Sequence, residues 1–331
     1  VLYRTNAQSR AIEDALMREG LAYKVVGGVR FYERKEIKDT LAYMKLVLNP
    51  HDDVSLRRVI NVPARGIGKG VMDTLEGQPA PSGAADLQDL PLLAAGLQPE
   101  PVANSLWSRL VRGLESRAFT GRAAASLAVF RDLVVGLTEV ARQETVAIAI
   151  AKMLDRSGYL EDLREDRSED SEARAENLAE LVSAAREYEG REPEASLAGF
   201  VDRLSLLSDA DEEQGTRNAR IWLMTLHSAK GLEFPVVVLA GLEEGLFPHS
   251  RSTEDEEELE EERRLCYVGM TRARIRLVLT GAARRRVFGE YQANDPSRFI
   301  DEVPDDLLDR QVPSVLSPSR QSRFQQHDVR Q

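Results

Sequence analysis

The sequence predicts an α/β fold in which a parallel sheet domain is split by a large, mostly α-helical insertion. Three observations predict it. Strand-like and helix-like segments alternate at the start, helical periodicity fills the middle, and short apolar strands return after residue 217. Such alternation is typical of parallel sheets, whose strands need crossover connections. We therefore expect a sheet domain over 1–45 and 218–304, an insertion over 46–217, and a disordered tail over 305–331.

The first part of the sheet domain has a β-α-β-α order. Residues 1–3 are the end of an apolar strand. The apolar residues of 11–16 follow the helical period, and Gly20 is suited to end that helix. A second strand is predicted over 22–28, followed by a helix over 37–48 that stops before a proline.

The insertion shows almost no strand pattern. Leu178, Leu181, Val182 and Ala185 have the spacing of one helix face, and Ser196 is suited to cap a further helix. The Pro/Gly/Ala-rich residues 76–91 predict a mobile connector. The acidic run over 209–215 superficially resembles a magnesium-binding box, but it does not end an apolar strand, so we interpret it as a solvated linker.

The α/β pattern then returns. Apolar runs over 219–224, 235–241 and 275–281 predict buried strands. Thr253 and Glu256 have the spacing of a capping box, which predicts a helix that begins there and runs to about residue 272.

Composition narrows the functional classes. The net charge of −11 argues against a uniformly nucleic-acid-binding surface, but arginines cluster at 263–264, 271–276 and 284–286. A single cysteine and four dispersed histidines predict no metal site and fit a reducing, cytoplasmic location. We predict no membrane span. The chain begins without methionine inside a predicted strand, so we expect it to be part of a longer protein.

The segment "MTLHSAKGLEF" over 224–234 is the first candidate site. Its Lys-Gly pair does not match the Walker phosphate loop, which needs G-x-x-x-x-G-K-[ST]. It follows a predicted strand, at the sheet edge where ligands bind. There Thr225 and His227 could donate to phosphate oxygens, and Glu233 could accept from a ribose hydroxyl. The alternative is a short helix capped by Ser228, and position alone favours neither.

Two further candidates have equally plain alternatives. Arg272 falls at a helix-to-strand junction near a sheet edge, where it could serve as an arginine finger or simply as a cation at a helix C-terminus. The segment "VPARGIGKG" over 62–70 could be a hairpin whose N–H groups face a DNA phosphate, or an ordinary turn.

Together these segments resemble the second half of the UvrD/PcrA/Rep group of superfamily 1 DNA helicases. The resemblance rests on "LYRTNAQSR", "VVGGVRFYERKEIKDTLAYMKLVLNPHDD", "INVPARGIG", "LMTLHSAKGLEFPVVVLAGLEEGLFPH" and "LEEERRLCYVGMTRAR", in that order, and covers residues 1 to about 303. It implies a RecA-like motor domain of the P-loop NTPase type, split by a mobile helical domain. The function it implies is ATP-dependent 3′-to-5′ unwinding of DNA in repair and replication.

The resemblance also implies roles for individual residues. Arg272 would be the catalytic arginine finger on the γ-phosphate, with Gly231 and Glu233 at the nucleotide. Other residues would contact DNA: Thr225, His227, Arg4, Asn6, Arg10 and Arg30 on the single strand, and Gly66, Ile67, Gly68 and Lys69 on the duplex.

Parts of such a motor are absent from these residues. The Walker loop and the magnesium-holding acids would belong to a first motor domain, so this chain alone is expected not to hydrolyse ATP with Mg²⁺. The expected partners are that domain, single-stranded DNA, its junction with duplex, and repair proteins. Two alternatives are an ATP-independent binding module for DNA or protein, and the motor of a helicase–nuclease.

Overall fold

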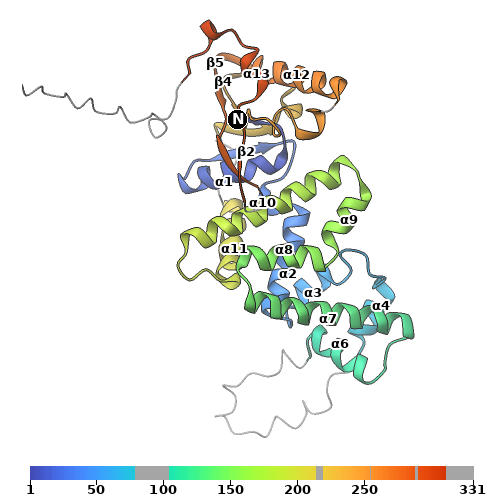
Figure 1. Cartoon of the computed structure of the whole chain (residues 1–331). Helices are drawn as coiled ribbons and strands as arrows, with labels where there is room; N and C mark the ends of the chain where they lie inside the picture. The colour runs from blue at the N-terminus through green and yellow to red at the C-terminus, as the bar shows by residue number, and fades with distance from the viewer. Residues whose placement is uncertain (79–103, 214–218, 254, 288–289, 311–331) are drawn as a thin grey trace, which may run out of the picture.

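A parallel sheet lies at one end of the molecule and a group of helices at the other, with α10 between them (Figure 1). The computed structural model describes residues 1–78, 104–213, 219–253, 255–287 and 290–310. The sheet has five strands in the order β2-β3-β1-β4-β5, and each neighbouring pair is parallel. The predicted α/β class is therefore confirmed.

The sheet interleaves the two ends of the sequence. Leu2 pairs with Met224 on one side and with Leu239 on the other, so β1 lies between strands that follow it by more than 200 residues. The five strands are β1 (Leu2–Tyr3), β2 (Tyr23–Val26), β3 (Ile221–Thr225), β4 (Phe234–Ala240) and β5 (Ala273–Thr280).

Helices cover parts of both faces of the sheet. On one face, Tyr3, Tyr23 and Leu223 pack with apolar residues of α1 (Ser9–Arg18). On the other face, Leu2 and Leu239 share a core with Leu265 and Cys266 of α12 (Glu256–Met270). The remaining elements after β3 are η6 (His227–Ala229), η7 (Ser250–Thr253), the antiparallel hairpin β6 (Arg284–Val287) and β7 (Glu290–Ala293), α13 (Arg298–Asp301) and η8 (Asp305–Leu307).

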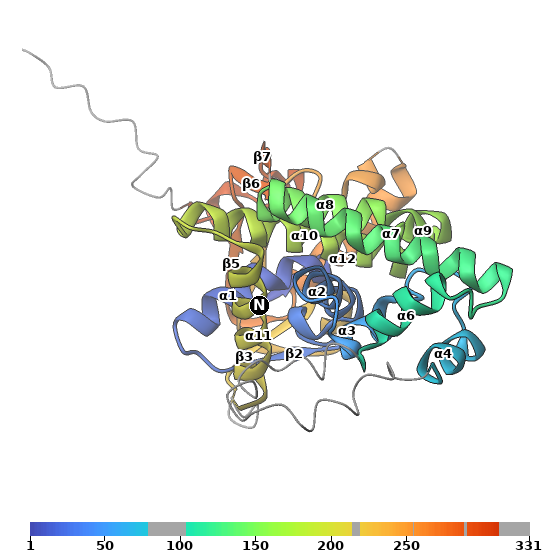
Figure 2. The ribbon, with the colours of Figure 1, turned by 90° about the horizontal axis from the view of Figure 1, so that it is seen from below.

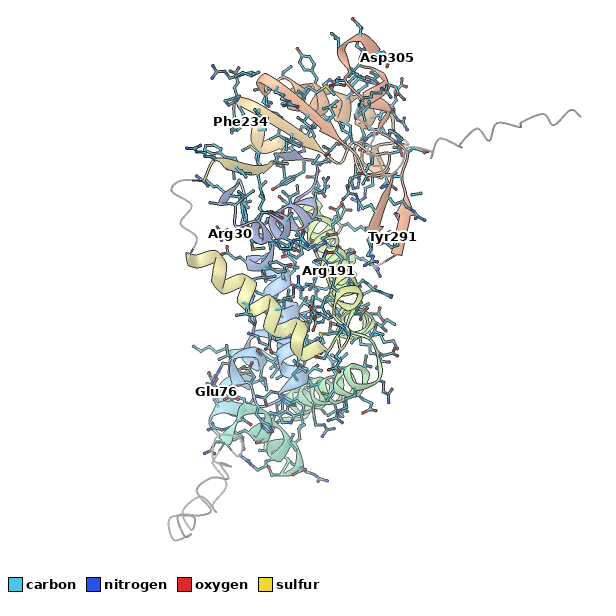
Figure 3. The ribbon with its side chains drawn as sticks, turned by 90° about the vertical axis from the view of Figure 1, so that its left-hand side faces the viewer. Arg30, Glu76, Arg191, Phe234, Tyr291 and Asp305 are labelled. Carbon is cyan, nitrogen blue, oxygen red and sulfur yellow. The ribbon has the colours of Figure 1, made fainter. Side chains whose placement is uncertain are left out.

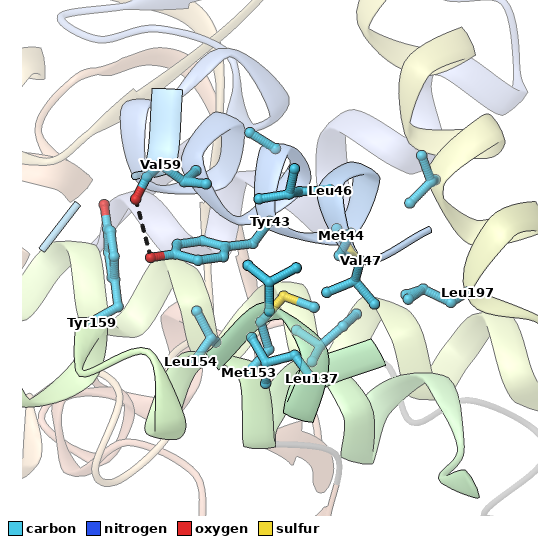
Figure 4. Close-up of a cluster of buried hydrophobic side chains, with 14 of the residues drawn as sticks. Tyr43, Met44, Leu46, Val47, Val59, Leu137, Met153, Leu154, Tyr159 and Leu197 are labelled. Carbon is cyan, nitrogen blue, oxygen red and sulfur yellow. Dashed lines mark hydrogen bonds between the residues drawn. The ribbon is translucent and has the colours of Figure 1, made fainter. Parts of the chain in front are cut away.

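The helical part has its own core, which extends from Phe31 to Leu204. Tyr43 lies within it and donates its hydroxyl to the carbonyl oxygen of Val59 at 3.3 Å (Figure 4). Seen from below, α7, α8 and α10 lie along one side of α2 (Figure 2). Among the described residues, no helix is long and apolar enough to cross a membrane.

The helices of this part follow two short 3₁₀ turns, η1 (Asn6–Gln8) and η2 (Phe31–Glu33). They are α2 (Lys35–Leu48), α3 (Asp53–Val59), α4 (Lys69–Glu76), α6 (Leu106–Glu115), α7 (Gly121–Gln143), α8 (Val146–Arg156), α9 (Tyr159–Asp166), α10 (Glu169–Arg191) and α11 (Leu197–Glu213).

Some predicted boundaries are confirmed and others are wrong. Ser196 accepts a hydrogen bond from the Gly199 N–H, as expected of a cap. The predicted capping box at Thr253 is wrong, because Asp255 caps α12 by accepting from the N–H groups of Glu257 and Glu258. A carboxylate closer to the helix start satisfies those donors instead.

Two segments predicted to be irregular are partly helical. Residues 209–213 continue α11 rather than forming a linker. The tail does not become disordered at 305, since η8 follows. Most of the 76–91 connector and residues 311–331 lie outside the described residues.

A buried arginine joins α1 to α10. Arg10 is 2% exposed. Its Nε donates to Glu180 at 2.7 Å, its Nη1 to Asp14 at 2.8 Å and its Nη2 to Glu187 at 2.9 Å. Burial alone would lower the pKa of Arg10, but the charges of Glu180 and Asp14 raise it above its usual value. The three carboxylates therefore stabilise the buried cation.

A second buried arginine extends the same junction. Arg34 donates to Asn177 Oδ1 at 2.7 Å, to Ser9 Oγ at 2.7 Å and to the carbonyl of Asn6 at 3.1 Å. Asn177 in turn donates to Glu36 at 2.6 Å. One residue of α10 thus links the start of α1 to the start of α2.

We expect Arg10→Met to destabilise the chain by about 3 kcal/mol, because three partly buried carboxylates lose their partner. Arg18→Met is the matched control, since Arg18 is exposed on the same helix and should change stability by less than about 0.5 kcal/mol. Urea unfolding followed by circular dichroism measures both. Equal stability of the two variants would contradict a structural role for Arg10.

Candidate functional site

The two edges of the sheet collect different groups of polar side chains. In a parallel sheet all carboxyl ends of the strands meet at one edge and all amino ends at the other. The connection over 226–233 starts where β3 ends and finishes where β4 begins, so it runs from the first edge to the second. Figure 3 shows Phe234 at the side of the sheet away from the helical part, whereas Arg30 and Tyr291 lie on the side toward the helical part.

Thr225 and His227 lie at the carboxyl edge. The Thr225 hydroxyl is 3.0 Å from Ser228 Oγ and accepts from the Ser228 N–H at 3.3 Å. This bond shapes η6, so Thr225, rather than the predicted Ser228, satisfies the start of the short helix. His227 follows, and it is accessible to solvent although part of its ring is covered by neighbouring groups.

The electrostatics of this edge favour a neutral imidazole. Partial burial of the ring, and then the nearby Arg4 charge, lower the pKa of His227. Near neutral pH the ring is therefore uncharged and can donate one hydrogen bond and accept another. A group of this kind suits an oxygen-rich ligand without adding positive charge.

The end of β1 lies beside the end of β3, because Tyr3 pairs with Thr225. Arg4 is held by Glu262, with 2.8 Å between Nε and Oε1. The other Glu262 oxygen accepts from the His249 N–H at 3.1 Å. Asn6 is exposed. Arg4 and Asn6 follow the end of β1 and therefore lie at the carboxyl edge. The neighbouring strand end, that of β3, carries Thr225 and His227.

Two residues predicted to contact DNA are not presented to solvent. Arg10 is enclosed by the three carboxylates described above. Arg30 is 8% exposed and packs with its guanidinium 5.2 Å from the Tyr23 ring centroid. Burial therefore argues against both contacts, and for Arg10 it points to a structural role.

Arg272, Glu233 and Gly231 meet at the amino edge. Arg272 donates from Nη1 to the Leu232 carbonyl at 3.1 Å, and its own carbonyl accepts from the Phe234 N–H at 2.9 Å. Glu233 and Gly231 are exposed, and Gly231 has a φ of +84°. The sequence placed Arg272 near the ligand-binding edge of the strands; the structure places it at the opposite edge, because it precedes its strand instead of following it.

Arg272 keeps capacity for a ligand. Its Nε donates to the Val268 carbonyl at 2.9 Å and its Nη2 to the Thr271 hydroxyl at 3.0 Å. With the bond to Leu232, three of the five N–H donors of a guanidinium are used within the described residues. The side chain is half-buried and oriented by backbone, an arrangement suited to hold a charge in a fixed position.

The turn over 61–68 joins α3 to α4. The Asn61 side chain accepts from the N–H groups of Arg65 at 2.8 Å and Ile67 at 3.1 Å. Ile67 is buried, whereas Gly66, which has a φ of +74°, and Gly68 are exposed. Lys69 is exposed in the first turn of α4. Asn61 and the buried Ile67 thus hold the turn in place, and the two glycines expose their backbone to solvent.

The hairpin β6–β7 carries a candidate that sequence reasoning missed. Tyr291 is 66% exposed, and its ring centroid lies 4.6 Å from the Arg286 guanidinium and 6.0 Å from that of Arg284. Arg285 between them pairs with Glu243 at 2.7 Å. The sequence shows the arginine run over 284–286, but only the pairing of β6 with β7 places Tyr291 beside it. An exposed ring flanked by cations suits a nucleic-acid base.

Within the described residues, no group of three or more His, Cys, Asp or Glu side chains could hold a metal ion.

Comparison with known proteins gives a consistent family. A model of the UvrD-like helicase C-terminal domain matches residues 1–91 and 112–284. ATP-dependent DNA helicase PcrA of Bacillus subtilis is 42% identical over 315 residues, which cover 93% of this chain and 40% of that protein.

PcrA proteins of two staphylococci are similar. That of Staphylococcus epidermidis is 40% identical over 330 residues, covering 98% of this chain and 42% of the relative. That of Staphylococcus aureus is 41% identical over 318 residues, covering 93% and 40%. The chain thus spans about two fifths of the length of these relatives. From the family model and these identities, the chain belongs to the UvrD-like helicase C-terminal domain family.

Proposed function

We propose that this chain is the second motor domain, with its helical insertion, of an ATP-dependent 3′-to-5′ DNA helicase that acts in repair and replication. The observation that carries the proposal is the connection over 226–233. Thr225, the last residue of β3, and His227 lie at its start, and Gly231 and Glu233 lie at its end beside Arg272. A single short segment therefore joins a surface suited to a phosphate backbone to one suited to a nucleotide.

At the carboxyl edge, Thr225 and His227 donate hydrogen bonds to the backbone of single-stranded DNA. Asn6 adds an exposed amide on the neighbouring strand. Because phosphate contacts carry little sequence information, this track holds any sequence. Tyr291 stacks on a base at the hairpin, which is equally tolerant of sequence.

At the amino edge, the residues fit ATP. The Glu233 carboxylate accepts from a ribose hydroxyl, and the exposed Gly231 lets the nucleotide approach the backbone. The two remaining N–H donors of Arg272 point a fixed positive charge at the γ-phosphate, where negative charge must be stabilised during transfer. Hydrolysis of ATP supplies the free energy for movement along DNA.

The insertion grips duplex DNA ahead of the single strand. Backbone N–H groups near Gly66 and Gly68 face a phosphate, and Lys69 adds charge. Ile67 anchors the turn in the helical core rather than contacting DNA itself.

Other partners complete the motor. The first motor domain of the same protein would supply the phosphate loop and the carboxylates that hold Mg²⁺. This chain by itself then binds DNA weakly and does not hydrolyse ATP. Measurable ATP hydrolysis by the purified 331-residue chain would contradict this division of labour.

In the intact protein, Arg272→Ala is expected to lower kcat for ATP hydrolysis by about 10³-fold, as loss of an arginine finger does. Affinity for single-stranded DNA should be largely kept, because Arg272 lies at the opposite edge from the DNA track. Arg274→Ala is the control, since Arg274 is exposed two residues away. An Arg272→Ala variant that is folded and hydrolyses ATP normally would rule out the finger role.

Replacing Thr225 by Val and His227 by Ala together should weaken binding of oligothymidylate by roughly 10-fold, since two hydrogen bonds to charged phosphates are lost. Thr280→Val is the control, because Thr280 is exposed at the same sheet edge on the outermost strand. Fluorescence anisotropy measures both. Unchanged affinity of the double variant would place the DNA track elsewhere.

Lys69→Ala should weaken binding of a duplex with a single-stranded tail while leaving single-strand binding unchanged. The slope of log affinity against log salt should fall by about 1, because one phosphate contact is removed. Lys38→Ala, an exposed lysine of α2, is the control. A salt slope that stays the same would show that Lys69 touches no phosphate.

A further inference from the structure

A cleft separates the β6–β7 hairpin from the helical insertion. It has a volume of about 590 Å³ and is lined by residues of the hairpin, of α9 and of α10. Thr5 and Gln8, which follow β1 at the carboxyl edge, also line it. The cleft therefore adjoins both the strand ends and the hairpin to which the proposed function assigns single-stranded DNA.

The carboxylates that line this cleft are all engaged by other side chains. The four pairs are Glu172 with Arg251, Glu176 with His249, Glu180 with Arg10, and Glu244 with Arg298. Their negative charge is thereby largely offset within the protein.

Three arginines of the lining have no such partner. Arg164 and Arg167 are exposed, Arg286 is half-buried, and none of the three forms an ion pair within the described residues. The Nε of Arg286 is buried and has no hydrogen-bond acceptor in that part of the chain. Arg285, which also lines the cleft, is paired with Glu243. The uncompensated charge of the cleft is therefore positive.

The arginines and the acids of α9 project in different directions. Arg164 and Arg167 are three residues apart, so they lie on the same face of the helix. Both line the cleft, unlike the exposed acids of this helix, which are Glu161, Asp162, Glu165 and Asp166. The positive side of α9 thus faces the cleft.

The other end of α9 is fixed to the turn over 61–68. Arg65 of that turn donates from Nη2 to the carbonyl of Ser157 at 2.7 Å, two residues before the helix begins. With eight residues, α9 is about 12 Å long, which corresponds to roughly three to four base pairs of duplex. The helix therefore leads from the turn that the proposed function assigns to duplex DNA to the cleft beside the hairpin.

We infer that Arg164, Arg167 and Arg286 hold backbone phosphates of the duplex where it meets the single strand. The inference rests on the proposed function, which places duplex at the turn over 61–68 and a single-stranded base at Tyr291. Duplex that runs between these two places passes along α9.

Arginine is suited to this role, because its guanidinium forms paired hydrogen bonds to phosphate oxygens. Arg286 is already oriented for it, since its guanidinium lies 4.6 Å from the Tyr291 ring centroid. Phosphates occur at every step of the backbone, so these contacts hold the junction at any sequence.

In the intact protein, Arg164→Gln together with Arg167→Gln should weaken binding of a duplex with a single-stranded tail by at least about 10-fold at about 0.15 M salt. The slope of log affinity against log salt should fall by about 2, because two phosphate contacts are removed. Both side chains are exposed, so the double variant should fold, and circular dichroism checks this. A folded double variant that keeps the full salt slope would overturn the inference.

Arg142→Gln together with Arg191→Gln is the matched control. It removes the same charge from two exposed arginines that do not line the cleft. Because distant charges are screened by salt, the control should lower the affinity by less than about 2-fold. A loss equal to that of the cleft variant would attribute the effect to net charge and overturn the inference.

Neutral methylphosphonate linkages in the DNA locate the contact. Placed in roughly the first four duplex steps beside the junction, they should weaken binding by the unaltered protein by about 10-fold. The cleft variant should lose no more than about 3-fold on the same change, because only Arg286 still meets those phosphates. Equal losses for the two proteins would overturn the inference.

The same linkages confined to the single-stranded tail test the other source of phosphate. They should leave the loss caused by the cleft substitutions unchanged. If they cancel that loss, the phosphates belong to the single strand and the duplex assignment is overturned.

The outcomes separate this inference from the proposed function. If the unaltered intact protein does not bind the tailed duplex, the proposed helicase function fails and the inference fails with it. If it binds, and Lys69→Ala lowers the salt slope while the cleft variant does not, the inference alone is overturned.

Discussion

The placement of the sheet against the helices depends on buried arginines that meet α10. Arg10 and Arg34 are both buried where they meet α10. Arg10 donates to the carboxylates of Glu180 and Glu187, and Arg34 donates to the side-chain amide of Asn177. Removing a charge from water is costly unless its donors are satisfied in good geometry. Few relative positions of α1 and α10 meet that condition, so these contacts define how the two parts meet in this structure.

The same junction fixes the surroundings of the carboxyl edge. Arg34 donates to the carbonyl of Asn6, directly after the strand end that carries Arg4. Arg4 is in turn held by Glu262 of α12, which also accepts from the His249 N–H. His249 lies 3.2 Å from Glu176 of α10. Arg4, which lies in the proposed DNA track, is therefore connected to α10 of the helical part through Glu262 and His249.

The distribution of charge is compatible with the proposed DNA surface on a strongly acidic chain. Several carboxylates of α10 and α12 are used internally, as partners of Arg10 and Arg4, instead of repelling phosphate. Glu243 is 1% exposed and likewise pairs with Arg285, which leaves Arg284 and Arg286 beside Tyr291 on the hairpin. Hydrogen bonds from Arg285 and its neighbours outweigh burial and lower the pKa of Glu243. Net charge thus says little about this local surface.

The sequence by itself determined the α/β class, the five strands of the parallel sheet, most helices and the family, because apolar periodicity and motif order are local properties of the chain. It could not decide burial. Arg10 and Arg30 lie in the same motif blocks as exposed residues, and only packing against α10 and Tyr23 removed them from solvent. Nor could it assign edges: Thr225 and Arg272 both adjoin strands, but strand direction puts them at opposite ends of the sheet. Tyr291 became a candidate only through strand pairing, since contact between residues distant along the chain is set by the tertiary fold.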